Sequence, residues 1–177
     1  NPKTWFDEVE DLLNQGVGPK VIFDFVEPSD GNCFVRVELN HRFNYLKPDG
    51  TLLSPNLWFD ACNGLPNGGV AKVKVNGKQN YINFNGKILF NNWFDFIGTF
   101  DAYGYAVVRG NGKINYIDVH SQDLIFPNWI SFDYVDNTQK IGFVTINGEQ
   151  YIVSGNGGLL DYETGASVNP GEVAGVK

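Results

Sequence analysis

The residues that could do chemistry are few and widely spaced along this chain. It has two histidines, His41 and His120, and two cysteines, Cys33 and Cys62. A Ser-His-Asp or Cys-His arrangement needs a histidine beside a nucleophile, and zinc needs three or four nitrogen or sulfur ligands. Nothing in the sequence suggests such groups together, so we expect no catalytic residue and no zinc site. The two cysteines are interpreted as buried thiols, with a single disulfide as the alternative.

Three aspartates recur in one sequence context and are the next candidates. Asp24, Asp60 and Asp95 each follow a phenylalanine. Repeated carboxylates beside Asn-rich loops could bind calcium, but no Asp-x-Asp-x-Asp-Gly loop occurs. We expect each aspartate instead to accept backbone N–H bonds of its own turn. No pair of carboxylates stands out for glycoside cleavage, and we predict neither a metal nor a cofactor.

Phosphate binding is also disfavoured. The string Gly-Asn-Gly-Lys at residues 110–113 lacks the second Gly-Lys-Ser/Thr element and the following helix of a phosphate-binding loop. The chain carries 13 basic and 20 acidic residues, for a net charge of −7. Because binding to a phosphate backbone needs clustered Lys and Arg, we predict no nucleic-acid partner.

The composition is that of a folded protein. Of 177 residues, 15% are aromatic and 19% charged, and no apolar run approaches the roughly 18 residues of a membrane span. We therefore predict no membrane insertion. The chain has no Met and begins with Asn, so we expect it to be part of a longer protein. The sequence does not fix the compartment; an extracellular, cell-surface or virion-associated location is favoured.

An internal repeat organises most of the chain. One marker is an Asn-Tyr-aliphatic triplet whose tyrosines, with a weaker last copy, are Tyr45, Tyr81, Tyr116 and Tyr151, spaced by 36, 35 and 35 residues. A second marker, Trp-Phe-Asp at residues 58–60, recurs 35 residues later at 93–95, and the next Trp is Trp129. Two independent markers with one period predict four units that begin near residues 22, 58, 93 and 129.

Each unit is predicted to be a three-stranded antiparallel β-meander. In the second unit, residues 69–75 alternate apolar and charged side chains, Asn76-Gly77 is a favoured hairpin turn, and the return strand leads through Asn85-Gly86 to a third strand. Two sets of positions are expected to point inward: Val35, Ala71, Ala106 and Ile141, and Val37, Val73, Val108 and Phe143. The other phase is expected to face water: Arg36, Glu38, Lys72, Lys74 and Arg109.

These elements define an all-β fold with three segments. Residues 20–160 form the array of four units, for which an open superhelical stack is preferred over a small closed propeller. Residues 1–19 are predicted to form a short helical cap, with a degenerate repeat as the alternative. Residues 161–177 are predicted to be a tail or linker. Trp58, Trp93 and Trp129 are interpreted mainly as packing between units.

The order of these motifs resembles the WG-repeat, or KWG, β-repeat family. The resemblance rests on "WFD", then "VAKV" or "YAVV", "NGK", "NYI" and "NGKIL", over residues from about 20 to 160. The Trp-Gly pair that gives the family its name is not intact. The resemblance implies a binding or scaffold module from bacteria or their phages, and it implies no catalytic residues.

Three functions are compatible with such an array. The favoured one is non-catalytic recognition of a protein partner, because the loops differ between units while the packing positions recur. The alternatives are a carbohydrate-binding module and a structural block of a virion or cell surface. The candidate binding residues are Trp58, Trp93, Asp101, Tyr103 and Tyr105.

Overall fold

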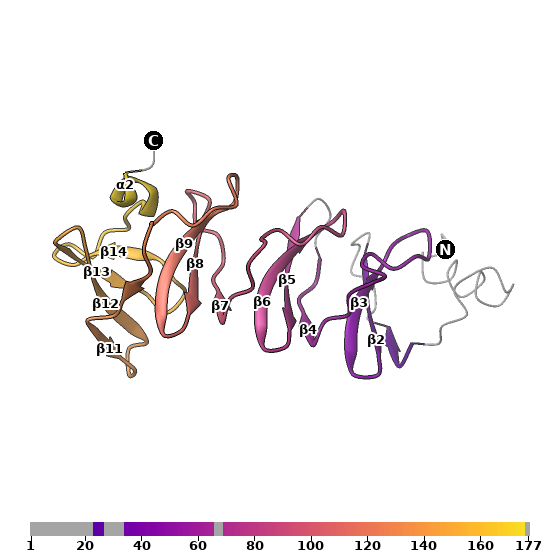
Figure 1. Cartoon of the computed structure of the whole chain (residues 1–177). Helices are drawn as coiled ribbons and strands as arrows, with labels where there is room; N and C mark the ends of the chain where they lie inside the picture. The colour runs from indigo at the N-terminus through magenta and orange to yellow at the C-terminus, as the bar shows by residue number, and fades with distance from the viewer. Residues whose placement is uncertain (1–22, 27–33, 66–68, 176–177) are drawn as a thin grey trace, which may run out of the picture. The chain divides into compact units, whose positions relative to one another are not determined.

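The protein folds into several small antiparallel β-sheets. A computed structural model describes residues 23–26, 34–65 and 69–175, and it is all-β apart from one short helix (Figure 1). The predicted cap at residues 1–19 lies outside the described residues, as does Cys33. Within the described part, no helix is long and apolar enough to cross a bilayer. The chain divides into two compact units, residues 1–91 and 92–177.

The first unit contains two three-stranded sheets, ordered β1-β2-β3 and β4-β5-β6. Their strands are β1 (Phe25–Val26), β2 (Val35–Leu39), β3 (Arg42–Leu46), β4 (Ala61–Cys62), β5 (Val70–Val75) and β6 (Lys78–Asn83). In each sheet a long hairpin carries a two-residue strand on its first edge. The buried core of this unit includes Val35, Val37, Leu46, Phe59 and Ile82.

The second unit contains two four-stranded sheets, ordered β10-β9-β8-β7 and β11-β12-β13-β14. Their elements are β7 (Phe96–Ile97), β8 (Tyr105–Gly110), β9 (Lys113–Asp118), β10 (Ile130–Ser131), β11 (Tyr134–Asp136), β12 (Ile141–Ile146), β13 (Glu149–Val153), β14 (Leu159–Asp161) and the helix α2 (Pro170–Ala174). One core joins the two sheets: Val107, Ile114, Tyr116 and Phe126 of the first pack with Val144, Ile146, Tyr151 and Val153 of the second.

The third strand predicted after each hairpin is reduced to a bridge in the first three sheets, whereas in the fourth it is present as β14, paired with β13. Residues 87–90 contribute a single β-bridge, Ile82↔Ile88, and bridges at Leu46↔Leu52 and Ile117↔Leu124 occur at similar distances from the hairpins. The sheet gains its third strand on the other side instead, where β4 pairs with β5 and β7 with β8. The pairing ends after this bridge because the buried Asn80 side chain bonds both the carbonyl and the N–H of Phe90, which therefore cannot pair with the strand.

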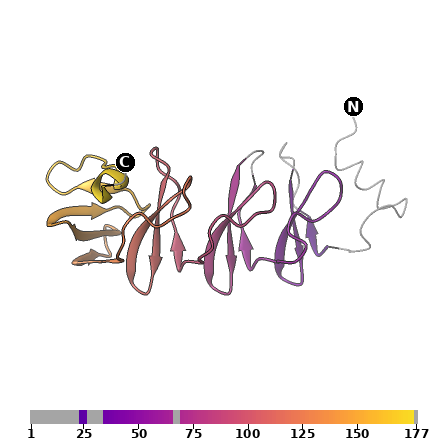
Figure 2. The same ribbon diagram turned by 45° about the horizontal axis from the view of Figure 1, so that its top comes forward.

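The same type of hairpin turn joins the two long strands of every sheet. Asn40-His41, Asn76-Gly77, Asn111-Gly112 and Asn147-Gly148 all have positive φ at both residues. A type I′ turn requires this conformation, and Asn and Gly adopt it at low cost. Figure 2 shows the paired hairpin strands from a second direction. His41 therefore lies at an exposed hairpin tip, as predicted from the repeat.

An aspartate caps three of these turns. The carboxylate of Asp24 accepts the backbone N–H of Asn40 at 2.5 Å, Asp60 that of Asn76 at 2.5 Å, and Asp95 that of Asn111 at 2.9 Å, always 16 residues apart. The recurring aspartates thus bind a backbone N–H, as predicted, but in a hairpin turn 16 residues further along the chain and not in their own turn.

A fully buried asparagine explains the Asn-Tyr marker. Asn44, Asn80 and Asn115 have no exposed surface. The side-chain amides donate to the carbonyls of Ser54, Phe90 and Phe126 at 2.7, 2.8 and 2.9 Å, and each Oδ1 accepts the N–H of the following tyrosine at 2.8 Å. Each asparagine therefore satisfies backbone groups where the chain leaves the hairpin, and the tyrosine that follows it is buried.

The predicted alignment of the repeats is wrong by one residue in the fourth sheet. Ile141 and Phe143 were predicted to point inward, but Gly142, Val144 and Ile146 are the buried residues of β12. The turn Asn147-Gly148 comes 36 residues after Asn111-Gly112, whereas Tyr151 comes 35 residues after Tyr116. Side chains alternate in a strand, so a one-residue shift moves each to the other face. Tyr151 consequently takes the position that Asn115 holds in the third sheet.

Of the five residues predicted to face water, only Lys74 is exposed, and Arg36, Glu38, Lys72 and Arg109 are half-buried. Arg36 is half-buried and donates to the carbonyl of Cys62 at 3.0 Å, and Arg109 is half-buried with its guanidinium carbon 5.2 Å from the centroid of the Phe96 ring. Long side chains of this kind can lay their apolar stems along the protein surface while the charged group reaches a polar or aromatic partner.

The end of the described chain is folded, although residues 161–177 were predicted to be a tail. Leu160 bridges Ser167, and Asn169 caps α2 by accepting the N–H of Gly171 at 2.9 Å. Val168 and Val173 pack on the core of the second unit. The prediction failed because a five-residue helix has too few turns to show a periodic apolar stripe.

Candidate functional site

Trp58 lines a hollow in the first unit. The hollow encloses about 390 Å³, and its walls include Leu39, Asn40, Arg42, Asn56 and Trp58. Trp58 is half-buried and also packs against the core of the first sheet. The guanidinium of Arg42 lies 3.6 Å from the carboxylate of Asp60. An aromatic ring beside two amides and a guanidinium offers one apolar face and several hydrogen-bond donors.

A second hollow lies in the second unit, between β8 and the β11–β12 hairpin. It encloses about 310 Å³, and its lining includes Arg109, Phe132, Val135, Asn137, Lys140 and Gly155. The guanidinium carbon of Arg109 is 5.8 Å from the centroid of the Phe132 ring. Gly142 permits this arrangement, since a Cβ there would stand 2.3 Å from a Phe132 ring carbon. The walls are therefore part cationic and part aromatic.

The other predicted binding residues do not line either hollow. Asp101 accepts the N–H groups of Tyr103 and Tyr105, both at 2.9 Å, and so holds a turn. Tyr105 is half-buried and packs beside α2, where a Cβ on Gly171 would stand 2.2 Å from the tyrosine hydroxyl. Tyr103 is 49% exposed. Trp93 is half-buried. Of these residues, Asp101 and Tyr103 belong to one loop of the second unit and Tyr105 begins β8 directly after it, whereas Trp58 belongs to the other unit.

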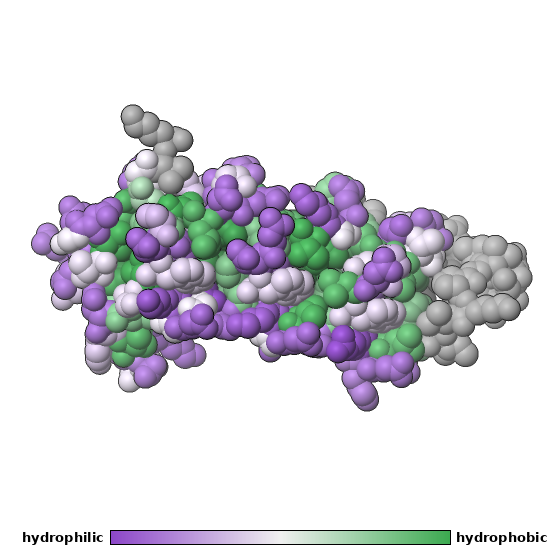
Figure 3. Space-filling model, in the orientation of Figure 1, coloured by the Kyte–Doolittle hydropathy of each residue, from purple (hydrophilic) through white to green (hydrophobic). Residues whose placement is uncertain are grey.

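The fourth sheet carries an exposed aromatic face. Tyr134 is 63% exposed and Tyr162 is 49% exposed. The rings of both lie near Phe143, with centroid distances of 5.8 and 6.0 Å. Phe143 pairs across the sheet with Ile152, and Ile152 with Leu160. We call Tyr134, Phe143, Ile152, Leu160 and Tyr162 the outer face of the fourth sheet. In the space-filling view, hydrophobic surface shows at β11 among hydrophilic residues (Figure 3).

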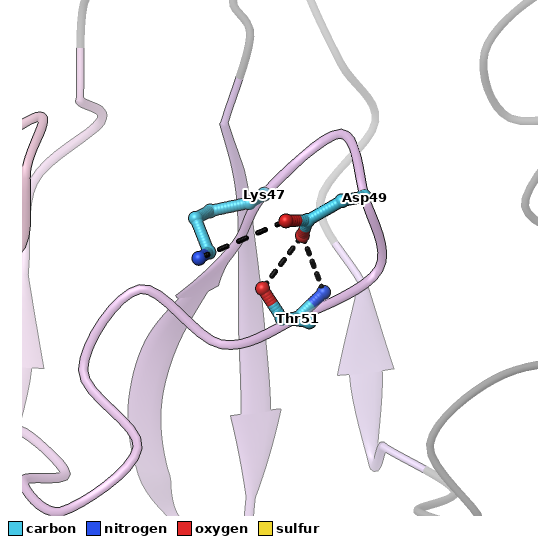
Figure 4. A network of polar contacts seen from close by, with 3 residues as sticks. All are labelled: Lys47, Asp49 and Thr51. Carbon is cyan, nitrogen blue, oxygen red and sulfur yellow. Dashed lines mark hydrogen bonds and ion pairs between the residues drawn. The ribbon is translucent and has the colours of Figure 1, made fainter.

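Several aspartates outside these areas accept hydrogen bonds within turns. Asp49 accepts the N–H and the hydroxyl of Thr51 at 2.9 and 2.6 Å and lies 3.8 Å from Lys47 (Figure 4). The hydrogen bonds from Thr51 lower the pKa of the Asp49 carboxyl. Thr164 lowers the pKa of Asp161 in the same way. The backbone N–H of His120 donates to Asp118 at 2.7 Å in an exposed turn. Among residues 23–26, 34–65 and 69–175, no group of three His, Cys, Asp or Glu is placed to hold a metal ion.

Sequence analysis missed the residues of the second hollow. Arg109 was assigned to water, and Phe132, Lys140 and Gly155 were not singled out. The one usable signal was Arg109 itself. It stands two residues before its hairpin turn, where the second sheet has Lys74 and the first sheet has Glu38. That difference marks a position where units diverge.

Comparison with known proteins finds similarity to solved structures but to no family or curated sequence. No protein-family model and no curated protein matches the sequence. A crystal structure of a protein of unknown function from Bacteroides caccae is similar over 75% of this chain and 64% of that chain, with 15% sequence identity and a TM-score of 0.28. This chain thus spans about two thirds of that protein, and at this TM-score the similarity carries no argument about function.

Proposed function

We propose that this protein is a non-catalytic recognition module, built of four repeats of the WG type, that binds a protein partner through the outer face of the fourth sheet. The observation that carries the proposal is the exposure of that face. Tyr134 and Tyr162 expose about half or more of their surface beside Phe143. Clustered exposed aromatic side chains of this kind characterise protein-interaction surfaces.

The third sheet shows how an equivalent face is covered by another sheet. Val107 pairs with Tyr116 on the third sheet, and both are buried against the fourth. Counted from the hairpin turns, Phe143 and Ile152 are the equivalent pair on the fourth sheet. That pair is only half-buried. The outer face therefore repeats, in more aromatic form, a surface that the protein covers elsewhere with another β-sheet.

Site-specific cross-linking tests this proposal. A photoreactive phenylalanine at position 134 or 162 is expected to capture one partner, whereas the same group at position 103 captures none. Tyr103 is a matched control, because its 49% exposure equals that of Tyr162. The purified partner should bind the Y134S/Y162S variant at least tenfold more weakly and the Y103S variant normally. Equal binding by both variants would refute the proposal. Capture of a second copy of this chain would favour the structural-block alternative.

A second candidate function is carbohydrate binding at the hollow beside Trp58. Sugars stack on aromatic rings and receive hydrogen bonds from amides and guanidinium groups, and this hollow combines Trp58 with Asn40, Asn56 and Arg42. Titration of Trp fluorescence with a panel of soluble oligosaccharides tests it. A saturable change that W58F retains and W58A loses would support binding at this ring. No change with any sugar in the panel would refute it.

A further inference from the structure

Arg109 is a half-buried cation beside two aromatic rings. It is half-buried in β8, and its guanidinium lies near the Phe96 and Phe132 rings at 5.2 and 5.8 Å. Its Nε atom is buried and has no hydrogen-bond partner. In the part of the chain that the structure describes, no carboxylate lies within ion-pair distance of this guanidinium. A partly desolvated cation without an anion is costly, although the chain has 20 acidic residues that could have supplied one.

Two aspartates at or beside the β11–β12 hairpin accept hydrogen bonds from other groups. Asp136 accepts the backbone N–H groups of Thr138 and Gln139 at 2.8 and 3.1 Å, and Asp133 accepts the hydroxyl of Thr145 at 2.8 Å. Neither lines the hollow beside Arg109. The charged residues that do line it, Arg109 and Lys140, are both cationic. The hollow therefore has a positive wall within a protein whose net charge is negative.

The uncharged residues that line the hollow indicate which group should lie beside a bound anion. Phe132, Val135 and Ile141 supply apolar surface, and Asn137 supplies an amide. The volume of about 310 Å³ falls at the lower end of the range for small-molecule sites, which suits one amino-acid side chain with its neighbouring backbone. Guanidinium groups bind carboxylates through two parallel hydrogen bonds. Because apolar residues lie beside the Arg109 guanidinium, the hollow favours a carboxylate that is attached to an apolar group.

We propose that this hollow is a binding site for a peptide carboxylate, either a chain terminus or an acidic side chain, with an apolar group packed on Phe132 and Val135. Arg109 receives the carboxylate, and Lys140 adds charge at the rim. Val135 and Tyr134 are consecutive in β11 and point to opposite faces. The site is thus distinct from the outer face of the fourth sheet and does not depend on that face having a partner.

The test uses the whole chain and defined probes. N-acetylphenylalanine, its neutral amide and inorganic phosphate are titrated into ¹⁵N-labelled protein, and the backbone N–H signals of Gly142 and Gly155 and the Nε–H signal of Arg109 are followed. We expect saturable shifts with the acid and at least tenfold weaker binding of the amide. Equal binding of acid and amide would overturn the proposal. Phosphate binding as tight as the acid would identify a simple oxyanion site and would also overturn it.

Variants locate the effect. R109Q should weaken binding of N-acetylphenylalanine at least tenfold. K113Q should leave it unchanged, since Lys113 is an exposed cation of β9 that does not line the hollow. Lys140 is exposed, so K140Q should fold normally. It should weaken binding severalfold, and this result decides the question if R109Q fails to fold. Unchanged affinity in a folded R109Q, or in K140Q, would refute the assignment.

Discussion

Replacing the buried asparagine of the third sheet should destabilise the second unit strongly. Asn115 has no exposed surface. Its amide donates to the Phe126 carbonyl at 2.9 Å, and its Oδ1 accepts the N–H groups of Tyr116 and Phe126 at 2.8 and 3.2 Å. N115A leaves these backbone groups buried without that partner. At about 1–1.5 kcal/mol for each of the three hydrogen bonds, the expected loss is about 3–4.5 kcal/mol.

Urea unfolding of the whole chain measures this loss, and hydrogen exchange at Tyr116 and Phe126 locates it. N128A is the matched control, because Asn128 is exposed and only its backbone carbonyl lies near the Asn115 amide, at 3.5 Å. N128A should cost less than about 0.5 kcal/mol, as surface substitutions usually do. If N115A and N128A unfold at the same urea concentration, the buried hydrogen bonds do not carry the stability assigned to them.

The N115D variant adds a test with a defined sign. The new carboxyl has no donor for the Phe126 carbonyl when ionised, so burial should raise its pKa above the unfolded value of about 3.9. A group whose pKa is raised in the folded state stabilises below the unfolded pKa and loses that contribution as pH rises through the folded pKa. N115D should therefore approach the wild type at low pH and weaken towards neutral pH. A pH-independent difference would contradict a buried site.

Three further predictions follow from individual contacts. G142A should lower the melting temperature, since its Cβ would meet a ring carbon of Phe132 at 2.3 Å and overpacking costs about 1–3 kcal/mol, whereas G64A, with open space around it, should not. Burial raises the pKa of Tyr81 from 10.0 to about 12, so absorbance at 295 nm should show late ionisation of one tyrosine that Y81F lacks. Its contribution to stability should be complete below pH 10 and lost towards pH 12. T51A should raise the pKa of Asp49 followed by NMR, because the Thr51 hydrogen bonds that lower it are reduced; an unchanged pKa would exclude that cause.

Local features were predictable because they depend on neighbouring residues. The Asn-Gly turns follow from the low cost of positive φ at those residues, and alternation in residues 69–75 follows from the pleat of a strand. Asp60 was predicted to bind N–H groups of its own turn, whereas it caps a hairpin turn 16 residues away, because strand pairing brings the two segments together. The buried role of Asn80 was not predicted, because a polar residue in a strand is ordinarily expected to face water.

The fourth sheet shows where the repeat period misleads. Its phase is set by the position of Asn147-Gly148, not by the spacing of Tyr151 from earlier tyrosines. A single-residue difference is small against a period of about 35, yet it exchanges the two faces of the strand. Counting from the hairpin turn would have given the correct inward residues.

The sequence by itself determined the β-hairpins, their turns and the scarcity of residues suited to catalysis, since each follows from the chemistry of a few consecutive positions. Only the tertiary structure decided that Arg109 faces Phe132 and Lys140 across a hollow, that Tyr105 packs beside α2, and that Phe143 is left on an outer face. Some of these residues are far apart in the chain. The exposure of others depends on whether another sheet packs on their face. Packing between sheets brings them together, and no local pattern records that choice.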